Sequence, residues 1–395
     1  MFIELHILQN FAPSNLNRDD TNSPKDCEFG GYRRARVSSQ CLKRAIRRSF
    51  ESEDLLPAEH LASRTKRLLD ALTEKLASPS RPAEQARVVA NAALAGIKLG
   101  PKDDGKTQYL LFLGDAEIKG LVRVIDQHWD DLAPMALATP VEGAEAPKAQ
   151  SAKQAKKAGK DAIPPAVGKA MEGVLNGGKA ADLALFGRML ADLPDRNIDA
   201  ACQVAHALST NKVSMEFDFY TAVDDLKPDD TAGADMLGTV EFNSACFYRY
   251  ANVDLGALLK NLDGDLELAR QTVEAFLRAS VLAVPTGKQN SMAAQNPPSL
   301  VMAVVRERGL WSLANAFVKP VAPNKDGDLV GRSVQALDSY WGKLTTMYGA
   351  KQLHGIWAAS MEDVKTTHLA GHLLPGVDEV VAKALAAAYP MVVGQ

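Results

Sequence analysis

A run of basic side chains near the amino terminus has the residue types needed to bind a polyanion. Between Phe29 and Phe50 the sequence has no acidic residue and these cations: Arg33, Arg34, Arg36, Lys43, Arg44, Arg47 and Arg48. The whole chain has a net charge of −3 and this stretch a charge of +7, so the remaining residues carry −10. Such a concentrated basic island in an acidic chain favours a nucleic acid as partner. The plainer interpretation is a solvated basic face, which is what most charge runs form.

The second half of this run is predicted to be a helix that begins at Ser38 or Ser39, either of which is a suitable N-cap. Apolar residues at helical spacing fall on one side of it, namely Leu42, Ala45, Ile46 and, on the flank, Phe50. The cations on the other side form two like-charge pairs four positions apart, Lys43/Arg47 and Arg44/Arg48. Each pair disfavours an isolated helix by about 0.2–0.5 kcal/mol. An external anion would relieve this repulsion.

Residues that could perform catalysis or bind a metal are few and scattered. The cysteines at 27, 41, 202 and 246 form no CxxC pair, which indicates reduced thiols, with Cys41 on the apolar side of its helix. Asp19 and Asp20 lack a third ligand nearby and are expected to cap turns or pair with an arginine. Gly287-Lys288 resembles part of a P-loop, but the residues required around it are missing. We expect no metal, no cofactor and no catalytic residue, and we expect His6 on a strand surface.

Length and composition are those of a globular chain. At 395 residues, with 46% hydrophobic and 24% charged residues, it could form two or three domains, or one domain with large insertions. No apolar run approaches the roughly 18–20 residues of a membrane span, and the first residues lack the basic region of a signal peptide. We therefore expect a cytoplasmic protein with no membrane partner.

Hydrophobic periodicity predicts the elements that position the basic helix. A strand at 2–8 and a long loop at 11–31 precede it, helices dominate 55–132, and a low-complexity, mobile insertion covers 139–165. Strands at 215–220 and 239–254 bracket a polar loop and predict a protruding hairpin. A helix at 265–285, a strand at 299–306, a strand-like stretch at 315–321 and C-terminal helices follow. Without the helical insertion, this order is that of a split βαβ, ferredoxin-like fold.

Six sequence blocks, in order over nearly the full length, resemble the CasC (Cse-type) backbone subunit of the type I-E CRISPR Cascade complex. They are SNLNRDD at 14–20, FGGYRRARVSSQCLKRAIR at 29–47, FYTAVDDL at 219–226, LGTVEFNSACFYRYANVDL at 237–255, GKQNSMAAQNP at 287–297 and LANAFVKPV at 313–321. The resemblance implies an α+β fold, with an RNA-recognition-like (ferredoxin-like) palm, an inserted helical fingers domain and a β-hairpin thumb. The implied parts are 1–54 (palm, with the basic helix), 55–198 (fingers, 139–165 mobile), 199–242 (thumb) and 243–395 (palm, with C-terminal helices).

The resemblance also implies a set of RNA-binding residues. The implied phosphate contacts are Arg18, Lys25, Lys43, Arg44 and Arg47. The implied base-wedging or stacking residues are Met189, Phe219, Tyr220, Thr221 and Val223. No phosphate role is expected for Tyr32 or Ile46, which are neutral here.

The implied function is non-catalytic. The subunit would line up head to tail with copies of itself along a crRNA guide, join other Cascade subunits, and meet target DNA through the guide in defence against foreign DNA. Phosphate contacts with stacking suit a protein that must accept any guide sequence. We further expect Asp224 and Asp225 to contact the next subunit, so that reversing both to lysine weakens assembly; intact filaments from that mutant would exclude the contact.

Two other functions remain open. The first is a CRISPR RNA-processing endoribonuclease with His6 or His206 as general acid or base, although no catalytic constellation recurs near the basic helix. The second is a stand-alone RNA-binding protein. Cleavage of repeat RNA would identify the enzyme, and oligomers whose size depends on RNA length would identify the filament subunit.

Overall fold

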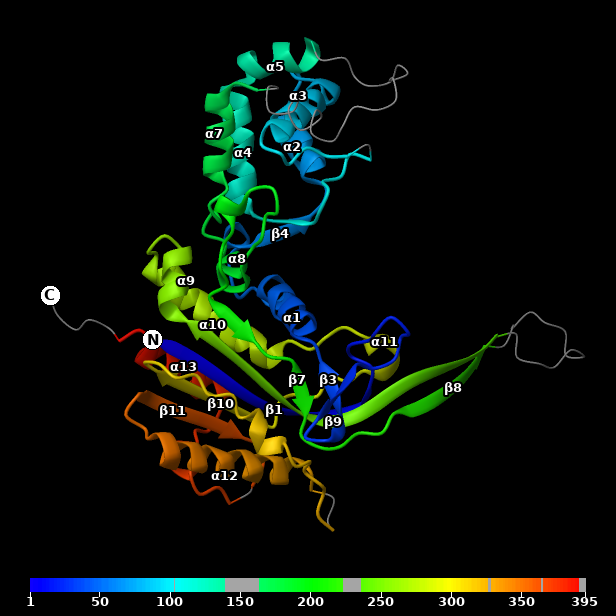
Figure 1. Cartoon of the computed structure of the whole chain (residues 1–395), viewed down its shortest axis with the longest axis vertical. Helices are drawn as coiled ribbons and strands as arrows, with labels where there is room; N and C mark the ends of the chain where they lie inside the picture. Colours follow the sequence, from blue (N-terminus) through cyan, green and yellow to red (C-terminus); the bar gives the residue numbers. More distant parts are fainter. Residues whose placement is uncertain (103, 139–162, 223–235, 326–327, 364, 391–395) are drawn as a thin grey trace, which may run out of the picture. The chain divides into compact units, whose positions relative to one another are not determined.

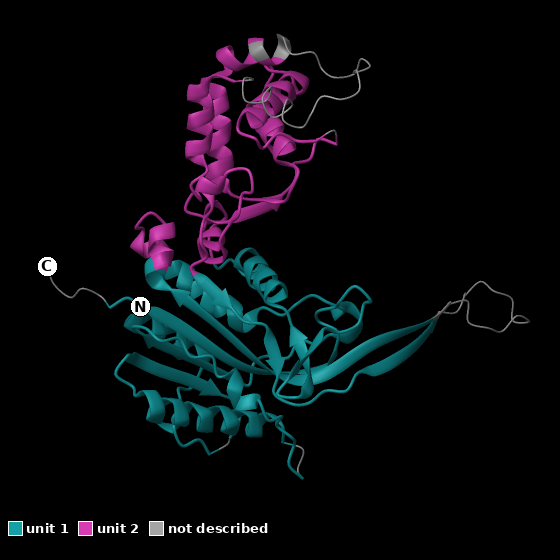
Figure 2. Cartoon of the chain, in the orientation of Figure 1, with its two compact units in different colours: residues 1–55, 202–256, 270–395 teal, residues 56–201, 257–269 magenta. Residues whose placement is uncertain are grey.

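The computed structural model describes residues 1–395 except 103, 139–162, 223–235, 326–327, 364 and 391–395. The chain divides into two compact units (Figure 2). Unit 1 comprises Met1–Leu55, Cys202–Gly256 and Arg270–Gln395, and unit 2 comprises Leu56–Ala201 and Ala257–Ala269. Most of the insertion expected at 139–165 falls outside the described residues. Among the described residues, no helix is both long and apolar enough to cross a membrane.

Unit 1 is built on a mixed α/β arrangement with an antiparallel sheet in the order β11-β10-β1-β9-β7-β3-β2 (Figure 1). Its strands are β1 (Phe2–Ser14), β2 (Asp26–Phe29), β3 (Tyr32–Val37), β6 (Cys202–Val204), β7 (Ala207–Ser209), β8 (Glu216–Ala222), β9 (Met236–Asp254), β10 (Leu300–Arg306) and β11 (Leu353–Ser360). β6 and β8 both pair with β9. Helix α1 (Ser39–Ser52) lies between β1 and β7 in the chain, and α10 (Leu266–Leu282) lies between β9 and β10.

Both faces of β1 are covered, which corrects one sequence prediction. Leu5 and Ile7 lie beside Leu42 and Ile46 of α1. On the other face, Leu8 joins a core cluster with Leu337 and Trp341 of α12 (Val330–Tyr348). His6 was predicted on a strand surface, yet it is fully buried, because α12 covers the sheet face that the alternating polar residues suggested was exposed.

Helix α1 forms as predicted. Ser38 is its N-cap, and its hydroxyl accepts a hydrogen bond from the Cys41 N–H at 3.4 Å. The buried side chains are Leu42, Ile46, Ser49 and Phe50, so the apolar side packs inward, and of the cations Arg44 and Arg48 face away from the core. Cys41 is half-buried and packs against a neighbouring apolar cluster.

Three segments of unit 1 differ from the sequence predictions. The stretch at 315–321 was predicted to be strand-like, but it contains the 3₁₀ helix Ala314–Phe317. The predicted loop at 11–31 includes the end of β1 and all of β2. The edge strand β11 was not predicted. The remaining helices of unit 1 are α11 (Gln289–Met292) and α13 (Val377–Ala388), of which α13 packs on β10 and β11.

Unit 2 is mainly helical among its described residues. Its elements are α2 (Leu68–Leu76), α3 (Ala83–Gly96), α4 (Asp115–Gln127), α5 (Trp129–Ala138), α7 (Pro165–Val174), α8 (Ala181–Phe186), α9 (Leu255–Asn261, which begins in unit 1), and the strand pair β4 (Ala62–Thr65) and β5 (Leu111–Gly114). Aliphatic side chains from α2, α3, α4 and α7 form one buried cluster, to which α7 contributes Val167 and Met171, as their helical periodicity predicts.

Candidate nucleic-acid interface

The cations of α1 divide into two rows. Arg44 and Arg48 are exposed, whereas Lys43 and Arg47 are half-buried. Arg44 and Arg48 line a groove of about 630 Å³ together with Arg18 and the segment Leu282–Gly287. Glu51 and Glu53 lie at the same groove, so its charge is mixed, with three arginines and two glutamates. The structure therefore brings Arg18 and Arg44 together. Lys43 and Arg47 are not among the described residues that line the groove.

A second basic cluster contains Lys25, the remaining predicted phosphate contact. Lys25 and Arg36 line the same small depression, and the Arg36 guanidinium lies 2.9 Å from Nδ1 of His206. Partial burial and the nearby Arg36 and Lys25 charges lower the pKa of His206 below its usual value. The imidazole is therefore neutral at pH 7, and its Nδ1 can accept the Arg36 hydrogen bond.

Two arginines of the basic run are committed to contacts within the protein. Arg34 is fully buried and donates hydrogen bonds to the carbonyls of Ser209, Thr210, Phe317 and Val318 at 2.7–3.2 Å. Arg33 forms an ion pair with Asp26. The sequence suggested one island of seven cations, but Arg34 is a structural residue inside unit 1 and is not available to an external anion.

The aromatic residues of the β8–β9 hairpin point to both of its faces. In the antiparallel register, Phe219 lies opposite Thr239 and Tyr220 lies opposite Gly238. Strand alternation places Phe217, Phe219 and Thr221 on one face and Tyr220 on the other. Phe217 and Phe219 are 66% and 63% exposed, which is unusual for phenylalanine. The predicted stacking residues therefore do not share one face. Val223, Asp224 and Asp225 lie outside the described residues.

Tyr220 lines a cavity of about 660 Å³ beside the hairpin. The other lining residues include Pro13, Asp218, Phe242, Lys288 and Met292. A Cβ atom at Gly238 would lie 2.4 Å from the tyrosine ring, so the ring occupies space that only glycine leaves open. The cavity combines aromatic walls with one cation, Lys288, which comes from the segment GKQNSMAAQNP.

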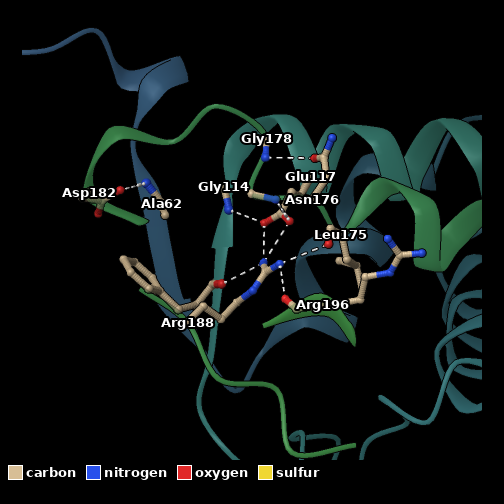
Figure 3. Close-up of polar contacts among 11 residues, drawn as sticks. Ala62, Gly114, Glu117, Leu175, Asn176, Gly178, Asp182, Arg188 and Arg196 are labelled. Atoms are coloured by element: carbon tan, nitrogen blue, oxygen red, sulfur yellow. Dashed lines mark hydrogen bonds and ion pairs between the residues drawn. The ribbon is translucent and has the colours of Figure 1, made fainter. Parts of the chain in front are cut away.

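Met189, the last predicted base contact, lies in unit 2 and is 78% exposed. It follows Arg188, whose side chain is buried in an ion pair with Glu117 (Figure 3). Met189 therefore lies in unit 2, whereas the groove and the hairpin are in unit 1.

The two histidines considered for catalysis have opposite surroundings. His6 is fully buried, and its Nδ1 lies 2.9 Å from the Tyr248 hydroxyl. Burial, with a contribution from the Arg306 charge, lowers the pKa of His6 to about 3. His206 is exposed beside the basic cluster. Only His206 can therefore reach an RNA molecule without rearrangement of the core.

Metal binding finds no support in the described part of the chain, where no group of three or more His, Cys, Asp or Glu side chains could hold an ion. Asp19 accepts hydrogen bonds from the Thr21 and Ser23 amides at 2.9 and 3.0 Å, so it caps a turn as predicted. Burial raises the pKa of Cys202 to about 12 and that of Cys246 to about 11, which keeps both thiols protonated.

Four surface residues were absent from the predicted site but belong to these surfaces: Arg36, Arg48, Phe217 and Lys288. Arg36 and Arg48 stand in the basic run, so their charge was visible, but not that Arg36 is half-buried beside Lys25 and Arg48 exposed at the groove. The alternation of Phe217 with Phe219 was also visible. Lys288 stood in the block GKQNSMAAQNP, but its place beside the hairpin depends on the tertiary fold and was not visible.

Comparisons with known proteins extend over the whole chain. A family model described as "CT1975-like protein" matches residues 3–382. A solved structure described as "CRISPR RNA-guided surveillance complex, pre-nicking" contains a similar chain, with a TM-score of 0.81, 31% identity, and coverage of 97% of this chain and 100% of that chain. Another, described as "CRISPR RNA-guided surveillance complex", has a TM-score of 0.72, 27% identity, and coverage of 98% and 100%. No curated protein sequence matches.

Proposed function

This chain belongs to the CT1975-like protein family, and from that premise we propose that it is a guide-RNA-binding subunit of a CRISPR RNA-guided surveillance complex. In its finer form, the proposal is a non-catalytic, CasC-like backbone subunit of type I-E Cascade. It would bind crRNA, assemble head to tail with its own copies and with other Cascade subunits, and display the guide for pairing with target DNA. Base pairing would then supply sequence specificity, and the protein would supply the scaffold.

The topology of unit 1 supports an RNA-recognition-like palm. Neighbouring strands β10, β1, β9 and β7 are all antiparallel, and α1 and α10 make the two crossovers. This is the strand order and direction of a ferredoxin-like fold. On this basis we assign the palm to unit 1, the thumb to the β8–β9 hairpin and the fingers to unit 2. A fold alone does not establish function, so the proposal depends on the surfaces that the fold carries.

The observation that carries the proposal is the groove in which Arg18, Arg44 and Arg48 meet. Exposed guanidinium groups on a capped helix and an adjoining loop can bind successive phosphates without reading base identity. The exposed Phe217 and Phe219 add a surface on which any base can stack, because every base has a π-face. Together they provide sequence-independent binding of a single strand.

Purification under mild salt, followed by extraction and sizing of bound nucleic acid, tests the proposal. We expect RNA of uniform length to co-purify with the wild-type protein when a CRISPR array is co-expressed. The double variant Arg18→Glu/Arg44→Glu should lose that RNA. Wild-type protein that elutes without RNA, or a double variant that retains as much RNA as the wild type, would contradict the proposal.

The endoribonuclease alternative keeps one supporting observation, the exposed neutral His206 beside Arg36 and Lys25. A neutral imidazole near a phosphate-binding cluster could act as a general base. Incubation of the purified protein with repeat RNA separates the two functions. We expect intact RNA; cleavage that is lost in His206→Ala would instead establish the enzyme.

A further inference from the structure

Met189 lies on a turn whose backbone is fixed on both sides. The amide and carbonyl of Arg188 both pair with Ile198, at 2.9 Å each. The Leu190 amide donates to the Asn197 side chain at 2.6 Å, and the Leu190 side chain is fully buried. Before the turn, Gly187 has a φ of +75°, and a Cβ atom there would lie 2.8 Å from the Ile198 carbonyl oxygen. An exposed apolar side chain thus stands between two anchored neighbours.

The Arg188 side chain ties four segments of unit 2 together beneath this turn (Figure 3). Its guanidinium contacts both carboxylate oxygens of Glu117, at 2.8 and 2.9 Å. It also donates to the carbonyls of Phe112, Leu175 and Arg196, at 3.1–3.3 Å. Glu117 in turn accepts hydrogen bonds from the Gly114 and Gly177 amides, at 2.9 and 2.7 Å. β5, α4, the end of α7 and the turn at 194–196 therefore converge on one ion pair.

The residue types of the Arg188–Glu117 ion pair indicate that it positions the turn more than it stabilises unit 2. The Arg188 and Glu117 side chains are 1% and 0% exposed, and burying two charges costs about as much free energy as their attraction returns. Replacing a buried ion pair by well-packed apolar residues of similar volume is often neutral or stabilising. What the apolar pair could not do is hold the turn in one orientation, because Nη1 and Nη2 of the planar Arg188 guanidinium bind Glu117 and three carbonyls from fixed directions.

We infer that the Arg188–Glu117 ion pair is a positioning device that holds Met189 against a nucleobase of the bound RNA. The inference rests on the proposed function, because it requires unit 2 to contact the guide. Arg188 and Glu117 touch no RNA in this scheme; they act through the turn. A thioether side chain suits this contact, because it is polarizable and packs well against aromatic rings.

A thermodynamic cycle on RNA affinity tests the inference. The full-length variants Met189→Ala, Glu117→Gln and the double variant are titrated with an oligoribonucleotide that carries 2-aminopurine, whose fluorescence reports packing of the base. We expect each single variant to weaken binding by about fivefold or more, the lower limit of a base-stacking contact. In the Met189→Ala background, Glu117→Gln should have no further effect on affinity or fluorescence.

Glu4→Gln is the matched control. Glu4 forms an ion pair with Arg306 in unit 1, and among the described residues it is the other pair in which both side chains are at most 1% exposed. Glu4→Gln should lower thermal stability as Glu117→Gln does, but leave RNA affinity unchanged. If Glu117→Gln does not fold, Arg188→Lys, which keeps the charge and loses the fork, replaces it. Additive effects of Glu117→Gln and Met189→Ala, or a Met189→Ala variant that binds as the wild type, would overturn the inference. Wild-type protein that binds no RNA would instead refute the proposed function.

Discussion

Arg34 and Arg44 have identical side chains and opposite surroundings. Arg34 satisfies four backbone carbonyls inside unit 1, and Arg44 lines an open groove. Charge in the sequence predicts that an arginine needs polar partners, but not whether these are water, an anion or backbone carbonyls. The same holds for His6, whose polar type suggested a surface and whose ring lies in the core.

The groove arginines should contribute separately to the salt dependence of RNA binding. For a single strand, each phosphate contact contributes about 0.7 to the slope of log affinity against log salt. We expect Arg18→Ala/Arg44→Ala to reduce this slope by about 1.4 between 50 and 200 mM salt. Arg278→Ala, which removes an arginine paired with Asp378 and Glu274, is the control and should leave the slope unchanged. Equal slopes for the groove variant and the wild type would exclude the groove as a phosphate site.

His6 should make the folded protein sensitive to acid. Its folded-state pKa of about 3 lies below the ordinary value of 6.5, so the unfolded chain binds the proton more readily. Stability is therefore lost as pH falls from about 6.5 towards 3. Between pH 7 and pH 5 the loss from this residue is about 2 kcal/mol in the free energy of unfolding. Denaturant titrations of the wild type and His6→Gln measure it, and the variant should lose about 2 kcal/mol less over that interval. Parallel pH dependences would show that His6 is not responsible.

At the scale of elements, periodicity predicted the helices and strands whose formation depends on local sequence. The capped helix α1, the strands of the hairpin and the leucine-rich helices of unit 2 all follow from spacing. The prediction of a strand-like stretch at 315–321 was wrong. The carbonyls of Phe317 and Val318 accept hydrogen bonds from Arg34 and not from a neighbouring strand. Only one wall of the groove, the cationic side of α1, could be predicted from the sequence. The helical pattern gives both cationic rows of α1, but the position of Leu282–Gly287 decides that the Arg44/Arg48 row lines it.

One face of the hairpin should carry the contact with bases. We expect Phe217→Ala and Phe219→Ala each to weaken RNA binding by about fivefold or more, because both exposed rings lie on that face. Glu216→Ala, on the opposite face of the same strand, is the control. Fluorescence anisotropy with an unstructured RNA measures all three. Loss of affinity in the control alone would assign the contact to the other face.

At the scale of the molecule, the similarity to chains of CRISPR surveillance complexes covers both units. The one contact between copies expected from the residues involves Asp224 and Asp225, which lie outside the described residues. The proposal of a filament therefore depends on the resemblance and needs a measurement of mass.

RNA length should control the size of the assembled particle. We expect light scattering to give a mass that rises stepwise as the RNA is lengthened, since each added copy of the 42.4 kDa chain needs its own stretch of guide. The Arg18→Ala/Arg44→Ala variant should show a weaker rise at the same RNA concentration. A mass of one protein per RNA at every length would instead establish a stand-alone RNA-binding protein.

Strand β9 belongs to both the sheet and the hairpin, and this continuity determines how a load on the hairpin reaches the sheet. Residues 236–242 pair with β8 and residues 243–254 pair with β1, so the hairpin is a cantilever clamped inside the sheet (Figure 1). A torque on Phe219 of β8 passes through its pairing with Thr239 to β9, whose backbone continues unbroken into the sheet. The register shift between Phe11 and Ser14 lies at that point, and the Asn15 amide braces the Glu241 carbonyl beside it at 2.9 Å. A load on the hairpin is therefore delivered to the sheet at this root, where the Asn15 contact supports β9.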